Sequence, residues 1–255
     1  MKLRLFVLIL LLPGFAFAQE DSFFTGIGYL KIYPIFHASM VWEWDDKYLY
    51  FDPVGEVKRY ADHPAPDLVV ITHAHRDHFS PQTLDSLDLS KAELIAPQSV
   101  VDKLSAPLKE KFASIRTMAN GEIYRWAGAS ITAVPMYTVI EDEYAPNAHD
   151  VRYPRGWGNG YVLTLGLKRF YVVGNSDNTP EMRSLEDIDV VFLSMNQPDI
   201  MDEKQAVEAI LAFRPKVVYP YQIKKERNVS SLNYLESVIG QSAPEVEIRL
   251  REWYD

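Results

Sequence analysis

The fold is decided by the stretch Ile71-Thr72-His73-Ala74-His75-Arg76-Asp77-His78, which directly follows the apolar run Leu68-Val69-Val70. Three of the six histidines and one carboxylate fall within six residues of this stretch. Imidazole and carboxylate groups are ligands that zinc and iron accept, and the end of a buried strand can hold them around one ion. The spacing therefore predicts a metal-binding loop. The alternative is a polar turn whose histidines only hydrogen-bond locally.

The loop resembles the THxHxDH signature of the metallo-β-lactamase superfamily, which is matched here by Thr72, His73, His75, Asp77 and His78. Further blocks resemble the superfamily's branch of metal-dependent hydrolases in the same order along the chain. These blocks are IFHASMV at 35–41, FDP at 51–53, GWGNGYV at 156–162, GNSD at 174–177 and PKVVYPY at 215–221. The resemblance implies an α/β fold, a four-layer αββα sandwich of two mixed β-sheets flanked by helices.

Hydrophobic periodicity predicts elements that suit two such sheets. Strands are expected at 28–34, 38–44, 47–52, 68–72, 92–96, 114–117, 122–126, 129–134, 161–165, 170–173, 190–193 and 217–219. Helices are expected at 81–87, 98–104, from Pro180, at 203–213 and at 230–239. Asp202 and Gln205 form the sequence pattern of a capping box for the helix at 203–213. The segment 138–157 carries charge and proline without periodicity, so we expect a long loop.

The first residues predict export. Lys2 and Arg4 precede the apolar run Leu5–Leu12, and Ala16-Phe17-Ala18 forms a small-x-small cleavage site. We therefore expect a signal peptide at 1–18, a single metallo-β-lactamase-like domain at 19–255, and a periplasmic or secreted protein without a membrane span after cleavage. An uncleaved membrane anchor is the alternative. The chain has no cysteine, so disulfides and thiolate metal ligands are excluded.

The charge of the chain argues against nucleic acid as a partner. The formal net charge is −9, and loss of Lys2 and Arg4 with the signal peptide would make it −11. Nucleic-acid binding depends on basic residues that displace counterions from phosphates. We therefore expect a small-molecule substrate, while the sequence leaves the oligomeric state open.

The resemblance also implies which residues would bind metal. A full site of the superfamily holds two ions, and His73, His75, Asp77 and His78 occupy four of its ligand positions. The other three positions are replaced: a terminal histidine by Tyr153, the bridging aspartate by Asn175 and the last histidine by Gln222.

These replacements weaken the predicted centre. Asn175 is neutral and cannot supply bridging charge, and tyrosine binds metal only after losing a proton with an ordinary pKa near 10. We therefore expect at most one ion, zinc first, with iron, manganese or no metal as alternatives. Tyr153, His149, Asp177 or Gln222 could act as a replacement ligand. His37 is expected to orient or line the site, and His63 to lie on the surface.

Two functions remain open. In the first, the protein is a hydrolase in which a metal-activated water attacks an ester, lactone, amide or phosphoester bond, with Asp77 as general base. In the second, it is a catalytically silent domain that keeps the fold and binds a ligand. In the hydrolase, Arg76 could neutralise Asp77 or contact an anionic substrate; the alternative is that its side chain is simply exposed.

Overall fold

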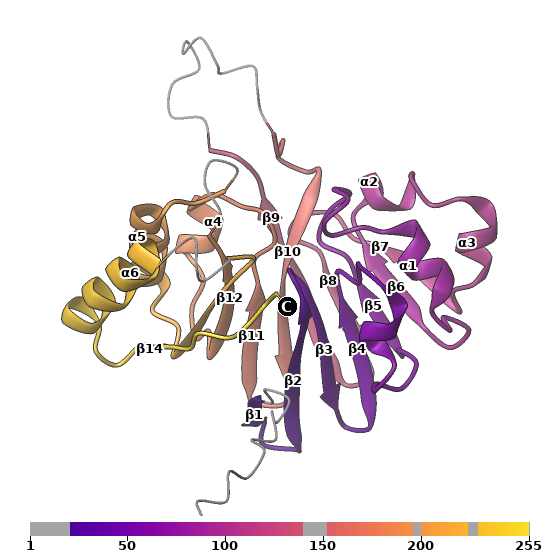
Figure 1. The fold of residues 1–255 in the computed structure, drawn as a ribbon, viewed down its shortest axis with the longest axis horizontal. Helices are drawn as coiled ribbons and strands as arrows, with labels where there is room; N and C mark the ends of the chain where they lie inside the picture. The colour runs from indigo at the N-terminus through magenta and orange to yellow at the C-terminus, as the bar shows by residue number, and fades with distance from the viewer. Residues whose placement is uncertain (1–20, 140–151, 196–199, 224–228, 255) are drawn as a thin grey trace, which may run out of the picture.

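The computed structural model describes residues 21–139, 152–195, 200–223 and 229–254. It contains two seven-stranded sheets packed face to face, with helices on both outer sides (Figure 1). The strand order is β1-β2-β3-β4-β5-β6-β7 in the first sheet and β14-β13-β12-β11-β10-β9-β8 in the second. Both sheets contain antiparallel and parallel pairs. The predicted αββα sandwich is confirmed.

The elements have the following bounds. The first sheet contains β1 (Asp21–Phe24), β2 (Tyr29–Phe36), β3 (Ser39–Trp44), β4 (Lys47–Phe51), β5 (Leu68–Val70), β6 (Glu93–Ala96) and β7 (Ser114–Thr117). The second contains β8 (Ile123–Trp126), β9 (Ala129–Met136), β10 (Gly158–Leu165), β11 (Lys168–Val172), β12 (Val190–Ser194), β13 (Val217–Tyr221) and β14 (Glu247–Ile248). The helices are η1 (Val57–Tyr60), α1 (Pro81–Ser86), α2 (Gln98–Val101), α3 (Ala106–Glu110), α4 (Pro180–Arg183), α5 (Glu203–Phe213) and α6 (Val229–Ser242).

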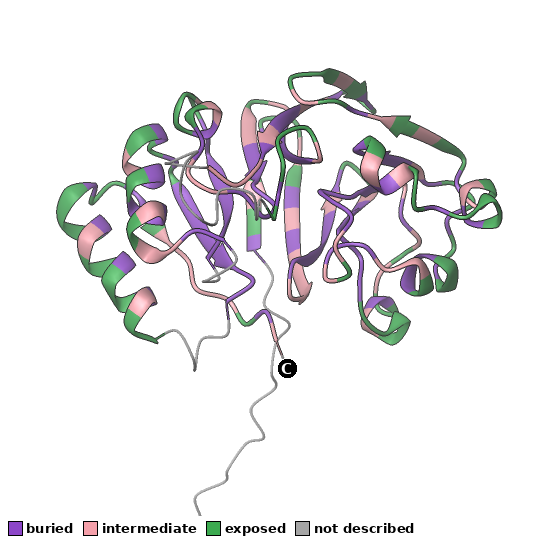
Figure 2. Ribbon diagram, turned by 90° about the horizontal axis from the view of Figure 1, so that it is seen from above, coloured by how far each residue is buried: buried purple, intermediate pink, exposed green. Residues whose placement is uncertain are grey.

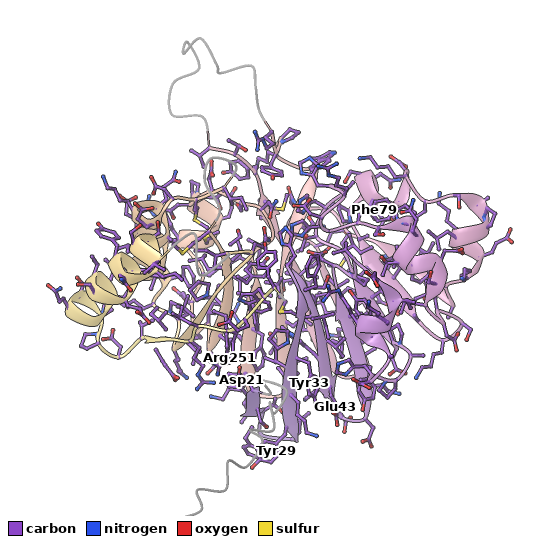
Figure 3. The ribbon with its side chains drawn as sticks, in the orientation of Figure 1. Asp21, Tyr29, Tyr33, Glu43, Phe79 and Arg251 are labelled. Atoms are coloured by element: carbon purple, nitrogen blue, oxygen red, sulfur yellow. The ribbon has the colours of Figure 1, made fainter. Side chains whose placement is uncertain are left out.

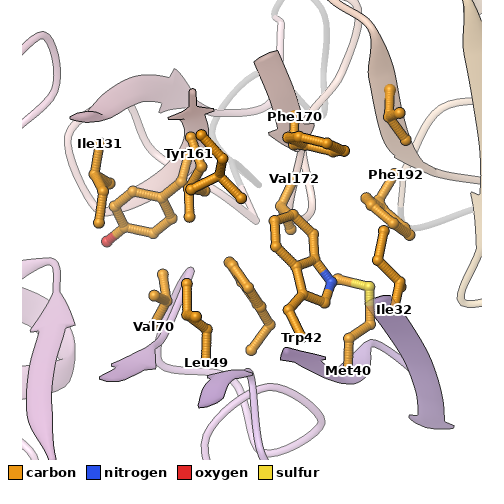
Figure 4. Close-up of a cluster of buried hydrophobic side chains, with 14 of the residues drawn as sticks. Ile32, Met40, Trp42, Leu49, Val70, Ile131, Tyr161, Phe170, Val172 and Phe192 are labelled. Carbon is orange, nitrogen blue, oxygen red and sulfur yellow. The ribbon is translucent and has the colours of Figure 1, made fainter. Parts of the chain in front are cut away.

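Three apolar cores separate the four layers. The central core lies between the sheets, where Trp42 packs against Phe51, Phe170 and Phe192 (Figure 4). The other two cores lie beneath α1–α3 and beneath α4–α6. Figure 2 shows the same pattern, with largely buried strands and helices that are exposed on their outer faces. Each fully buried large apolar side chain stabilises the fold by about 1.5–3 kcal/mol.

Local sequence explains where the helices begin. Ser80, Ser105 and Thr179 each accept a hydrogen bond from a backbone amide of the first turn, and a proline follows within the first two positions. The capping box of Asp202 and Gln205 is present at the start of α5. Such caps satisfy amides that have no partner inside a helix.

Several elements differ from the prediction. η1, β1, α3 and β14 were not expected from the sequence. α2 is shorter than the predicted 98–104. β13 continues through Pro220, which the sheet accepts because β14 pairs only with Val217 and Val218. The predicted signal peptide and most of the 138–157 loop lie outside the described residues. Within the described ranges, no helix is long and apolar enough to cross a membrane.

Candidate metal centre

The histidine loop follows β5, at the edge where the parallel strands end. His73 and His78 are fully buried, His75 is partly exposed and Arg76 is exposed. The backbone amides of His78 and Phe79 both donate to the His75 carbonyl, at 2.9 and 2.7 Å, so the loop is a tight turn. The His73 and His78 rings lie 4.1 Å apart between centroids.

Asp52 is a site residue to which the sequence analysis gave no role. It follows β4, is fully buried, and accepts hydrogen bonds from the amide and hydroxyl of Thr72, both at 2.7 Å. Its Oδ2 also lies 2.6 Å from Nδ1 of His78. Burial lowers the pKa of His78, but the Asp52 carboxylate outweighs this and the net pKa is raised. The FDP block at 51–53 was the sequence signal that could have indicated Asp52, but the block alone does not show which residue the aspartate contacts.

These contacts fix the tautomers of the two buried imidazoles. The Thr72 hydroxyl donates its only proton to Asp52, so it can only accept from Nδ1 of His73, at 2.9 Å. Nδ1 of His73 therefore carries hydrogen and Nε2 keeps its lone pair. When His78 is neutral, its bond to Asp52 likewise leaves Nε2 with a lone pair. Hydrogen bonds of this kind orient the histidine ligands of metal sites.

The Nε2 atoms of His73 and His78 are buried and have no hydrogen-bond partner. Oδ1 of Asn175 and both side-chain amide atoms of Gln222 are also buried without a hydrogen-bond partner. Buried polar atoms without partners are rare, and an absent ion or water commonly explains them. Burial lowers the pKa of His75 and holds that of His73 well below its usual range, so both rings are neutral near pH 7, the form that binds metal.

Asp77 is held by His37, at 3.3 Å from Nε2 to Oδ2, so His37 lines the site as expected. Burial raises the pKa of Asp77, but the hydrogen bond from His37 and the nearby His78 hold it well below its usual range. The carboxylate is therefore ionised. Oδ2 of Asp77 lies 4.0 Å from Nε2 of His78.

The three replaced positions face the histidines from the second sheet. Tyr153 packs its ring 5.0 Å from His75 and 5.6 Å from His73, and its hydroxyl accepts a hydrogen bond from Nδ2 of Asn175 at 2.9 Å. Burial raises the pKa of Tyr153, which keeps the phenol protonated and a poor ligand. Gln222, just after β13, approaches His78.

The remaining candidates lie elsewhere. Oδ2 of Asp177 accepts a hydrogen bond from the Val139 amide at 2.8 Å, so that oxygen serves the loop after β9. His63 is half-buried, and its ring lies 4.9 Å from that of Tyr33, away from the histidine loop. His149 lies outside the described residues.

Three residues at the site have strained backbone conformations. His37, Asp52 and Gln222 have positive φ values of 58°, 43° and 62°. Such conformations cost about 1 kcal/mol or more for residues other than glycine. Side chains held here against that cost point to a functional arrangement.

The C-terminal segment completes one wall of the site. Trp253 is buried; its carbonyl accepts from the His37 amide at 2.7 Å, and its indole donates to the Pro220 carbonyl at 2.8 Å. The Tyr254 ring lies 5.6 Å from that of His37, and its hydroxyl donates to the Gln222 carbonyl at 3.2 Å. No motif in the sequence indicated this contact.

The donor atoms do not form a complete metal centre by themselves. Among the described residues, no three His, Asp or Glu side chains form a ready metal-binding group. The two buried ring nitrogens without a hydrogen-bond partner belong to His73 and His78, whereas the HxH pair of the motif consists of His73 and His75. A single ion would be completed by His75 or by an amide oxygen of Asn175 or Gln222. A second ion has no bridging carboxylate between these groups.

The fold and the site together define a protein of the metallo-β-lactamase class. The chain belongs to the family described as "Beta-lactamase superfamily domain", which matches residues 31–222. The predicted superfamily is thereby confirmed. The match includes every predicted site residue and ends before Tyr254.

Relatives carry names of the same class. A UPF0173 metal-dependent hydrolase of Thermus thermophilus is 29% identical over 173 residues, which cover 66% of this chain and 66% of that relative. The chain thus spans just under two thirds of that relative's length. A UPF0173 metal-dependent hydrolase of Nanoarchaeum equitans is 28% identical over 194 residues, covering 75% and 82%.

Solved structures show the same fold. A crystal structure from Parabacteroides distasonis, described as a "Putative metal-dependent hydrolase", is 30% identical in sequence, with a TM-score of 0.76 over 94% of this chain and 100% of that one. Igni18, a metallo hydrolase from Ignicoccus hospitalis, has a TM-score of 0.68 at 21% identity, over 89% and 96% of the two chains. The two UPF0173 relatives and the Parabacteroides distasonis protein are described as metal-dependent hydrolases, which agrees with the predicted enzyme class.

Proposed function

We propose that this protein is an exported, metal-dependent hydrolase that holds one ion between His73 and His78, completed by His75 or by an amide oxygen of Asn175 or Gln222, and that it cleaves an ester, lactone, amide or phosphoester bond of a small molecule. The observation that carries this function is the pair of buried Nε2 atoms of His73 and His78, oriented through Asp52 and Thr72 and left without partners. Zinc suits neutral imidazole donors, and iron or manganese are the alternatives.

When bound, the ion would lower the pKa of a water molecule and polarise the scissile bond. The chain's own groups supply the rest of the chemistry. Asp77 is ionised, and His37 holds its Oδ2, so the carboxylate is oriented to accept a proton as general base and to return it to the leaving group. Trp157 packs its ring 4.8 Å from that of His75 and limits access of bulk water on that side.

The second candidate is a silent binding domain, and one contact favours it. Asn175 and Tyr153 hydrogen-bond to each other, so two former ligand positions pair without an ion. In that case His73 and His78 would hold an ordered water or a polar ligand.

Turnover distinguishes the two functions. The purified protein, supplied with zinc, iron or manganese, is assayed against a panel of esters, lactones, amides and phosphoesters. A hydrolase should act on one class and lose at least about a hundredfold in kcat with Asp77→Asn, the usual size of a general-base contribution. Asp177→Asn is the matched control. Absence of turnover across the panel, or full activity of Asp77→Asn, would contradict the proposed mechanism.

A further inference from the structure

We propose that the end of the molecule opposite the histidine loop docks on a lipid bilayer through an exposed apolar patch of Phe24, Ile27, Tyr29 and Leu167. The exposed fractions of these residues are 56%, 63%, 62% and 83%. They belong to two turns that lie far apart in the sequence, the β1–β2 turn and the β10–β11 turn. Docking here is independent of the hydrolytic activity.

The two turns are packed together into one tip. The Leu167 amide donates to the Thr25 carbonyl at 2.7 Å, and the Phe24 and Tyr29 rings lie 5.3 Å apart. Gly166 has a φ of +57°, and a side chain there would clash with the Thr25 carbonyl, so the close approach depends on glycine. Figure 3 shows Tyr29 at the lower extremity of the molecule, below Asp21. The exposed apolar side chains of the tip therefore gather at one end of the molecule.

The chemistry of the tip favours a bilayer as its occupant. Aromatic rings beside aliphatic side chains are typical of segments that insert at the boundary of headgroups and acyl chains. The nearby lysines are paired, Lys31 with Glu43 at 3.4 Å and Lys168 with Asp189 at 2.9 Å. The chain carries a net charge of −9. Binding should therefore depend on apolar insertion and not on anionic lipids.

The position of the tip in the chain supports the same occupant. The apolar run Leu5–Leu12 precedes Asp21, the first residue of β1, and Phe24 is the last residue of that strand. Asp21 is thus only about 10 Å along the strand from the patch. During export, before cleavage after Ala18, a membrane-inserted N-terminal segment would present this end of the fold to the bilayer.

Docking in this way would leave the site open to water. β10 begins at Gly158, where an added Cβ would lie 3.0 Å from Cβ of His73, and ends at Leu165 beside the tip. Its eight residues separate the two ends by about 23 Å.

The test uses the protein purified from the soluble fraction, with the same N-terminus in every variant, and vesicles of zwitterionic phosphatidylcholine in a flotation assay. The wild type should float with the vesicles at low and high salt. Phe24→Ser, Ile27→Ser and Leu167→Ser together should reduce the bound fraction by at least about tenfold, because apolar burial drives interfacial binding. The single variant Leu167→Asp should act in the same direction and leave folding unchanged, because Leu167 is 83% exposed.

The matched control removes three other exposed apolar side chains, with Val57→Ser, Ile123→Ser and Tyr234→Ser, and should bind like the wild type. Docking is overturned if the wild type does not float, or if Leu167→Asp and the triple variant still bind. It is also overturned if the wild type is a dimer by sedimentation and the triple variant a monomer, because a second copy would then cover the patch.

Discussion

The side-chain amide of Asn175 donates to the Tyr153 hydroxyl at 2.9 Å, so two of the three replaced ligand positions pair with each other. The pair is neutral and supplies no bridging charge. The candidate ligands His73 and His78 follow the first sheet and are oriented through Thr72 and Asp52. The four candidate ligand positions in the histidine loop are thus kept while the three positions on the second sheet are changed, and this difference underlies the proposal of a single ion.

Restoring the three changed positions should restore the second ion. Tyr153→His, Asn175→Asp and Gln222→His together return two imidazoles and a bridging carboxylate, and this triple variant should bind about two ions per chain. Asn175→Asp alone should do little, because a bridge without terminal ligands leaves the second ion under-coordinated. Elemental analysis after dialysis gives the comparison. A folded triple variant without a second ion would show that the backbone around these positions has diverged.

Asp52→Asn should damage both stability and metal binding. The carboxylate is fully buried and accepts from Thr72 and His78, so its removal should cost about 3–5 kcal/mol in the free energy of unfolding. Loss of such an orienting group typically lowers metal affinity about 10- to 100-fold. Denaturant titration and competition with a chelator measure the two effects. Asp189→Asn, on a carboxylate paired with Lys168 and Lys216, should leave metal affinity unchanged.

The metal-free protein should be most stable near pH 6.5. Below that pH the unfolded chain protonates His73 and His75, whose pKa values are lowered in the fold, so stability falls, by up to roughly 1.4 kcal/mol per pH unit for the fully buried His73 and by less for the partly exposed His75. Above about pH 6.5 the stability falls again. The pKa of His78 is raised in the folded protein, so the stabilisation from protonated His78 is lost as the pH rises through that folded-state pKa. Unfolding between about pH 5 and 8 in the presence of a chelator tests this. His73→Gln should flatten the acid side, and an unchanged acid slope would argue against a neutral buried His73.

The ring of Tyr254 should contribute more than its hydroxyl to the stability of the protein and to the placement of His37. Tyr254→Phe keeps the ring against His37 and Phe36 and loses one hydrogen bond, worth about 1 kcal/mol. Tyr254→Ala should cost about 2–3 kcal/mol and disturb His37. Unfolding free energies and the NMR signals of the His37 imidazole report both effects. Equal behaviour of the two variants would exclude a role of the ring in placing His37.

Export predicts a defined N-terminus. Mass spectrometry of the protein released from a periplasm or a culture medium should find a chain that begins at Gln19, because Ala16-Phe17-Ala18 is the cleavage pattern. Recovery of intact Met1 from the soluble fraction would instead indicate a retained segment.

The sequence predicted the fold because its strongest local signals agree with the global arrangement. The buried run before His73 and the capping box at Asp202 each appear where expected. Short elements such as β1 and α3 were missed, because four or five residues carry too little periodicity without their neighbours.

The candidate site was predictable only where a motif marked it. His73, His75, Asp77 and His78 share one motif. The partnership of Asp52 with His78 spans 26 residues, and that of Tyr254 with His37 joins two segments that lie far apart in the sequence. Such contacts come from strand order and from the path of the C-terminal segment, which residue spacing does not encode.

The number of metal ions per chain tests the central claim most directly. The protein is purified without added metal, dialysed against a mild chelator, and analysed for zinc, iron and manganese beside His73→Ala. A single site predicts about one ion per chain in the wild type and almost none in the variant. Two retained ions would contradict the single site, and a wild type that binds none, even after metal is added back, would contradict a metal-dependent hydrolase.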